Sequence, residues 1–210
     1  MPFSEQETAR TQARYQRIAP LYDAMEVFAE RRYADWRPQL WSMIKGPKVL
    51  EVGVGTGKNM PYYPAGVEIT AVDLTPGMLE RASARAAALE ANVNLQLGDV
   101  QNLDFPDNSF DEAVATFVFC SVPDPILGLD EITRVLKPNG RLLLLEHVRS
   151  VNAVLGTLMD MLEPITVRLM GPHINRRTVE NVQQSRLQLK KVEDMGLGDI
   201  FKLIVARKSG

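Results

Sequence analysis

The sequence predicts an α/β fold in which a mostly parallel sheet is covered by helices on both faces. Short apolar segments alternate with helical segments through the middle of the chain, as they do in buried parallel sheets. The first apolar segment runs directly into three closely spaced glycines. Near the end of the chain, two strand-like segments flank a glycine-containing turn, which predicts an antiparallel pair at the edge of the sheet.

The composition is that of one ordinary globular domain. The 210 residues are 45% hydrophobic and 24% charged, and the net charge of −2 gives no general attraction to nucleic acid. The single cysteine, Cys120, indicates a reducing compartment. The N-terminus lacks the apolar core of a secretory signal, and the longest aliphatic run, Leu142 to Leu145, is too short to cross a bilayer. We therefore expect one domain over residues 1–210, as a cytoplasmic monomer or homodimer, with peripheral contact at the inner membrane face left open.

The N-terminal part is predicted to be helical from Ser4 to Trp41, interrupted at Pro20 and Pro38, and to form a cap over residues 1–45. Its basic residues could attract lipid phosphates, although such a pattern more often marks a solvated face. These residues are Arg10, Arg14 and Arg17, which share one helical face, and Arg31 and Arg32.

The strands and helices of the central part are expected in strict alternation. Thr75 is placed to cap one helix, with Pro76 in its first turn, and residues 137–140 stop another. The expected strands are 49–52, 67–72, 93–97, 112–119 and 141–145, and the expected helices are 76–90 and 125–136.

The C-terminal third changes pattern. Residues 151–170 are apolar and rich in methionine, and a short helix is expected over 178–185. Residues 187–192 and 200–206 are the two strands of the closing antiparallel pair.

The glycines after the first strand predict a nucleotide-like ligand. Gly53, Gly55 and Gly57 let the backbone turn and approach a ligand closely, since no Cβ intervenes. The dinucleotide pattern G-x-G-x-x-G would need a third glycine at Lys58 or Met60. The phosphate-binding loop G-x-x-x-x-G-K-[ST] would need other residues at two of its positions.

Acids recur at the ends of later strands, where ligands of open α/β sheets bind. Asp73, about 20 residues after the glycines, can accept both hydroxyls of a ribose, as it would in an NAD enzyme too. Asp99 ends the third strand, and an apolar stretch, Phe117 to Ser121, ends the fourth. Taken singly, Asp73 could cap a helix and Asp99 could form a turn. The recurrence at successive strand ends favours a ligand site.

These motifs resemble those of class I S-adenosylmethionine (SAM) methyltransferases, which have a Rossmann-like seven-stranded sheet. The segment Glu51 to Gly57 is similar to their first motif. The N-terminal Tyr22-Asp23 and the turn from Arg134 to Gly140 resemble the ubiquinone/menaquinone C-methyltransferase-like branch. Leu145-Glu146-His147-Val148 is closer to phospholipid N-methyltransferases and small-thiol methyltransferases.

The resemblance implies a role for each matching position. The main chain at Gly53 and Gly55 would approach the methionine part of SAM, and Glu51 would orient the loop or take the amino group through water. Asp73 would hold the ribose, while Asp99 and the Val100 N–H would meet the adenine. The full set of implied SAM-binding residues is Glu51, Gly53, Gly55, Gly57, Asp73, Leu74, Met78, Asp99, Val100 and Phe117.

The resemblance further implies a methyl transfer that leaves S-adenosyl-L-homocysteine. The expected acceptor is small and apolar or lipid-like, with a phosphatidylethanolamine-type amine or a quinone-type ring carbon ahead of a thiol. His147 and Tyr22 are the candidates for base or acceptor orientation, and no metal set is expected. Residues 151–185 are expected on the acceptor side. Their apolar part, 151–170, is a greasy pocket, a lid dipping into a membrane, or an ordinary core-covering helix. A silent SAM-binding regulator and an NAD-dependent oxidoreductase stay open as rivals.

Overall fold

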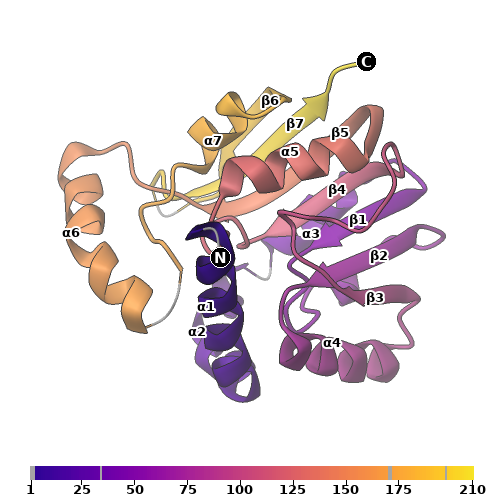
Figure 1. Ribbon diagram of the computed structural model, residues 1–210, viewed down its shortest axis with the longest axis horizontal. Helices are drawn as coiled ribbons and strands as arrows, with labels where there is room; N and C mark the ends of the chain where they lie inside the picture. Colours follow the sequence, from indigo (N-terminus) through magenta and orange to yellow (C-terminus); the bar gives the residue numbers. More distant parts are fainter. Residues whose placement is uncertain (1–2, 34, 170–171, 197) are drawn as a thin grey trace.

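The computed structural model describes residues 3–33, 35–169, 172–196 and 198–210 (Figure 1). Seven strands form one sheet in the order β3-β2-β1-β4-β5-β7-β6. The strands are β1 (Lys48–Val52), β2 (Glu68–Asp73), β3 (Val93–Leu97), β4 (Phe110–Thr116), β5 (Leu136–His147), β6 (Leu187–Asp194) and β7 (Phe201–Lys208). Strands β1 to β5 pair in parallel, and β7 runs antiparallel to both β5 and β6. The predicted fold class is confirmed.

Helices cover both faces of this sheet (Figure 1). The long helices are α1 (Phe3–Ile18), α2 (Tyr22–Tyr33), α4 (Pro76–Leu89), α5 (Pro125–Val135) and α6 (Ala153–Leu169), and the short ones are α3 (Trp36–Ser42) and α7 (Thr178–Gln184). Two 3-10 segments, η1 (Ala19–Leu21) and η2 (Met60–Tyr62), complete the described elements. Within the described ranges, no helix combines the length and the apolarity needed to cross a membrane.

The core explains why the central strands are almost continuously apolar. Leu142, Leu143, Leu144 and Leu145 of β5 are all fully buried, because β5 lies inside the sheet and has helices or loops on each face. Alternate residues therefore pack into different clusters, with Leu142 and Leu144 on one face and Leu143 and Leu145 on the other. This rigid sheet fixes where each strand ends.

The helical segment is interrupted ahead of Pro38 as predicted, since α2 ends at Tyr33 and Pro38 lies in the first turn of α3, where proline is tolerated. Two local predictions were wrong. Strand β4 ends at Thr116, because Phe117 has a left-handed φ of 58°. Strand β5 begins at Leu136 and continues through the expected turn at 137–140, with a bulge in its pairing with β4.

Candidate active site

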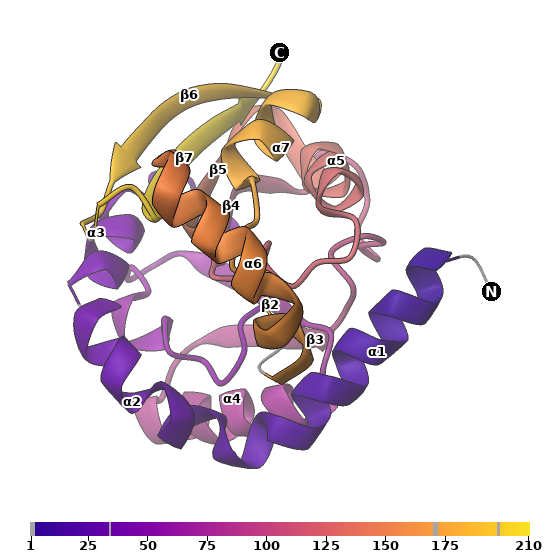
Figure 2. The same cartoon turned by 90° about the vertical axis from the view of Figure 1, so that its left-hand side faces the viewer.

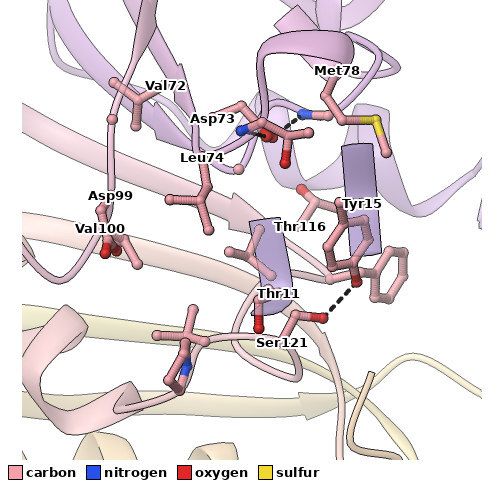
Figure 3. Close-up of a pocket in the computed structure, with 18 of the residues that line it drawn as sticks. Thr11, Tyr15, Val72, Asp73, Leu74, Met78, Asp99, Val100, Thr116 and Ser121 are labelled. Atoms are coloured by element: carbon pink, nitrogen blue, oxygen red, sulfur yellow. Dashed lines mark hydrogen bonds between the residues drawn. The ribbon is translucent and has the colours of Figure 1, made fainter. Parts of the chain in front are cut away.

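A cavity lies at the carboxyl ends of β1, β2, β3 and β4, where the sequence predicts a ligand (Figure 3). Most of the predicted site residues meet in its wall. These are Tyr22, Gly53, Gly55, Asp73, Leu74, Met78, Asp99, Val100 and Phe117. The parallel strands bring them together, although they span almost 100 positions of the sequence. Three predicted residues, Glu51, Gly57 and His147, are absent from this wall.

Asp73 fixes the shape of the glycine-rich loop. Its Oδ2 accepts a hydrogen bond from the Gly55 N–H at 2.8 Å, and its Oδ1 accepts one from the Thr75 N–H at 2.9 Å. The second bond closes a turn ahead of α4, whose Gly77 N–H is capped by the Gln16 Oε1 at 2.8 Å instead. The Asp73 carboxyl also lines the cavity, and burial raises its pKa. Of the two roles weighed for Asp73, its place in the cavity wall agrees with binding a ligand, whereas another residue caps the helix.

Gly53 and Gly55 differ in whether a side chain would have room at their position. Gly53 and Gly55 have left-handed φ angles of 66° and 56°. A Cβ on Gly53 would lie 2.4 Å from the Val118 side chain, whereas a Cβ on Gly55 would meet nothing within 4 Å. Gly55 thus borders open space in the cavity, which leaves room for a ligand against the backbone.

Substitution of Gly55 by alanine is expected to weaken SAM binding at least tenfold while costing only about 1–2 kcal/mol of stability, the strain of a left-handed alanine. Gly66→Ala is the matched control, because Gly66 has a φ of 78°, equally open space, and a position at the opposite end of β2. Titration calorimetry with SAM and urea unfolding measure both variants. Equal SAM affinities in the two variants would contradict a ligand at Gly55.

The Asp99 carboxylate is held by Gln101, which also contacts the N-terminal helix α1. Its Oδ1 accepts from the Gln101 N–H at 2.9 Å, and the Gln101 Nε2 donates to the Asp99 carboxylate and to the Thr8 hydroxyl. The adjacent Val100 is buried in the cavity wall. The end of β3 is therefore connected to α1.

Glu146 shapes the wall after β4. It is fully buried, and its Oε1 accepts from the N–H groups of Val118 and Phe119 at 3.0 and 3.1 Å. Within the described residues, its Oε2 has no hydrogen-bond partner. Burial raises the Glu146 pKa from its ordinary 4.5 to about 7. The sequence prediction used Glu146 only for the family resemblance, because the pattern gave no sign that it folds back onto this loop.

This pKa gives stability a definite pH dependence. Above pH 4.5 the unfolded chain has released the Glu146 proton, which the folded protein keeps up to about pH 7. The free energy of unfolding therefore falls as the pH rises through this window. Glu146→Gln keeps the acceptor oxygen without the ionisation. We expect its urea-measured stability to fall less than that of the wild type between about pH 5 and about pH 8. Equal losses in both proteins would contradict the assignment.

Helix α1 contributes Thr11 and Tyr15 to the wall of the cavity (Figure 3). The hydroxyls of Tyr15 and Ser121 share a hydrogen bond of 2.6 Å, and the Gln12 Nε2 donates to the Leu74 carbonyl at 2.8 Å. Next to Tyr15, Tyr22 lines the same cavity, with their ring centroids 6.3 Å apart. Burial raises the pKa of both tyrosines, so both hydroxyls stay protonated. Sequence reasoning placed Ser121 in the stretch after the fourth strand but missed Tyr15, since only the docking of α1 brings the two together.

A second, polar hollow adjoins the other side of the glycine loop. Arg37, Lys58 and Asn59 line it together with Gly53 and Gly55. The buried Arg37 guanidinium donates to Asn59 Oδ1 at 2.7 Å and to the Glu30 carboxylate at 2.6 and 3.1 Å. A cation is thus held beside the loop by tertiary contacts. Sequence reasoning could not find this arginine, because nothing in the sequence distinguishes an arginine that will be buried from one that will be exposed.

Glu51 lies beneath this hollow rather than in it. Its carboxylate accepts from Asn59 Nδ2 at 2.6 Å and from the Tyr63 hydroxyl. Burial raises its pKa to about 7, against the opposing effect of these hydrogen bonds. Of the two roles predicted for Glu51, orienting the loop agrees with this geometry.

The comparisons with known proteins agree with the site. Residues 50–144 match the model of a methyltransferase domain family. A phosphatidylethanolamine N-methyltransferase of Cereibacter sphaeroides is 31% identical over 76% of this chain and 79% of its own length. A demethylmenaquinone methyltransferase of Staphylococcus aureus (strain JH9) is 36% identical over 86% of this chain and 79% of its own length. The chain belongs to the class I SAM-dependent methyltransferases.

A solved SAM-dependent methyltransferase from Thermotoga maritima has the same fold. It superposes with a TM-score of 0.71 at 23% identity, over 93% of this chain and 98% of that one. This methyltransferase uses SAM as its methyl donor. Its cavity suits that molecule, because a buried carboxylate and an open glycine backbone face the same space.

The remaining predicted residues lie next to the site. His147, at the end of β5, is half-buried and packs edge-on against Phe201, with 5.3 Å between ring centroids. Burial lowers its pKa, so the methyltransferase holds it neutral. Gly57 packs against Met60 and Ala82, where a Cβ would clash, and so shapes the loop from behind. The side chains of Arg31 and Arg32 lie outside the described residues.

Proposed function

We propose that this enzyme methylates a small, lipid-like acceptor, either a phosphatidylethanolamine-type amine or a quinone-type ring carbon. The observation that carries the proposal is the part of the cavity wall formed by Tyr15, Tyr22 and Phe117. This part is aromatic, and its polar groups are hydroxyls. The names of the relatives from Cereibacter sphaeroides and Staphylococcus aureus support the same two acceptor classes.

The cavity divides into a donor side and an acceptor side. Asp73 would accept the ribose hydroxyls, and Asp99 with the Val100 N–H would bind the adenine between Leu74 and Met78. Arg37 in the polar hollow would pair with the carboxylate of the methionine part, beside Gly53 and Gly55. This leaves the methyl group directed at the tyrosine side of the cavity.

The protein needs little covalent chemistry of its own. When bound, SAM supplies a methyl group already activated on a sulfonium. Tyr22, with its raised pKa, would orient the acceptor by donating its hydroxyl proton in a hydrogen bond. Helix α1 would exclude water by closing the mouth. We assign acceptor orientation to Tyr22 rather than His147, because Tyr22 borders the cavity.

Methyl transfer from tritiated SAM into a total lipid extract tests the proposal. The expected result is labelled product in the organic phase, which chromatography then assigns to a methylated amine headgroup or a methylated quinone. Heat-inactivated enzyme is the blank. Label confined to water-soluble thiols would overturn the lipid-like acceptor. No label in any extract would favour the silent SAM-binding alternative.

A further inference from the structure

Helix α6 carries most of its large apolar residues on the side that faces solvent, while Met159 is buried against the protein. Val154, Leu158, Met161 and Ile165 are 82, 48, 72 and 57% exposed. Their spacing of four, three and four residues places them in one stripe along the helix. Leu155 and Leu162, also exposed, widen the stripe on one side. We call these six residues the α6 stripe.

The two acids of α6 pair with residues of the neighbouring segments. The Arg149 guanidinium pairs with Asp160 at 2.7 Å, and His173 pairs with Glu163. Asn175 also donates to Asp160, at 3.1 Å. A helix that covers a core has the reverse orientation. Of the three interpretations of residues 151–170, the core-covering helix is therefore wrong. Met170, the last residue of that segment, lies outside the described ranges.

The helix is connected to the mouth of the cavity. The chain that follows α6 returns along it, and there the His173 N–H donates to the Cys120 carbonyl at 2.9 Å. The Arg176 guanidinium donates to the Val122 carbonyl, also at 2.9 Å. The loop that receives both bonds includes Ser121 and Val122, which line the cavity. A partner that binds the α6 stripe would thus lie next to the part of the cavity wall formed by Ser121 and Val122.

The shape of this region favours a lipid surface over a protein partner. Helix α6 stands away from the sheet as a single projecting helix, on the same side as α1 (Figures 1 and 2). A protein partner would need a groove to receive it, whereas the boundary between lipid headgroups and acyl chains accepts a projecting amphipathic helix directly.

The charges agree with this choice. The acids of α6 both have partners on the protein, since Asp160 pairs with Arg149 and Glu163 is hydrogen-bonded to His173. The exposed Arg168 lies in the last turn of α6. Helix α1 contacts the strand ends through Gln12 and Gln16, so its opposite face, with the exposed Arg10 and Arg17, points away from the sheet. Cations beside an apolar stripe complement anionic lipids.

We propose that the α6 stripe inserts into a lipid surface and so presents the cavity mouth to a membrane-embedded acceptor. The proposal rests on the lipid-like acceptor proposed above. Insertion would spare the acceptor from leaving the bilayer fully, because the loop held by His173 and Arg176 forms part of the cavity wall.

Flotation of the full-length enzyme with phosphatidylcholine vesicles, with and without an anionic phospholipid, tests the insertion. We expect binding that is stronger on anionic vesicles, weakens with salt, and falls at least tenfold in the V154E/M161E variant. Leu89→Glu is the matched control, since Leu89 is 46% exposed at the end of α4 and should leave binding unchanged. All the altered residues are exposed, so urea unfolding should show little change in stability.

The outcomes separate this proposal from the proposed function. Unchanged vesicle binding of V154E/M161E, or no binding of the wild type at low ionic strength, would overturn the insertion. A wild-type dimer in solution that this variant dissociates would also overturn it, since the stripe would then bind a second copy. In detergent micelles containing the acceptor, the variant should keep wild-type turnover. Vesicle binding through the stripe without any lipid methylation would overturn the proposed function alone.

Discussion

The Asp73→Asn variant is expected to bind SAM at least a hundredfold more weakly than the wild type, a difference of about 2.7 kcal/mol. Two effects of the amide act together. It can no longer offer two acceptor oxygens to the ribose hydroxyls, and charge-assisted hydrogen bonds are the stronger kind. Its NH₂ group must also face the N–H of either Gly55 or Thr75, both of which now donate to the carboxylate.

The asparagine variant tests the site more cleanly than alanine. Asp73→Ala would leave both N–H groups without their partner, at about 1–3 kcal/mol each, so lost affinity could reflect a distorted loop. Asp104→Asn is the control, because it removes the same charge from an exposed position. Titration calorimetry should show wild-type affinity in the control. Retained affinity in Asp73→Asn would remove Asp73 from the SAM site.

The Arg37→Gln variant is expected to bind S-adenosylhomocysteine at least thirtyfold more weakly, a loss of about 2 kcal/mol. Its affinity for 5′-methylthioadenosine should change less than threefold. That ligand has the adenine and the ribose but no methionine carboxylate. Arg37 adjoins the glycine loop from the polar hollow, so a role in carboxylate binding predicts a loss for one ligand only.

A merely structural role would weaken both ligands equally. Such a role would act through Asn59, which accepts a hydrogen bond from Arg37 and donates one to Glu51 under the loop. The stability cost should be modest, since Glu30 keeps Lys58 as a second partner at 3.1 Å when Arg37 is lost. Arg141→Gln is the control, because Arg141 pairs with Glu112 at the opposite end of the sheet. It should change neither ligand's affinity.

The sequence predicted the donor side of the site well for a physical reason. In a parallel sheet the carboxyl ends of neighbouring strands lie at one edge, so residues just after strands must converge. Gly53 follows β1, Asp73 ends β2 and Asp99 lies just after β3, and all three line the cavity. The same rule does not place His147 in the cavity. His147 ends β5, yet it packs on Phe201 beside the cavity rather than in its wall.

The acceptor side depends on how helices dock, which periodicity leaves open. An amphipathic pattern defines an apolar stripe but not the direction in which that stripe points. Helix α6 is oriented by Arg149 and His173, two residues outside its own pattern. Its apolar side consequently faces solvent, where a sequence argument alone would place it in a core as readily.

The sequence by itself determined the fold class through strand periodicity, and the family and the cofactor through the resemblance of its local motifs: the glycine loop and the acids at strand ends. Only the tertiary structure decided which groups complete the site. Tyr15 meets Ser121 across 106 positions, and Arg37 meets Asn59 across 22. Such pairs leave no local pattern, since their contact depends on packing between elements. The identity of the donor was therefore present in the sequence, whereas the surroundings of the acceptor arise from the docking of α1, α3 and α6.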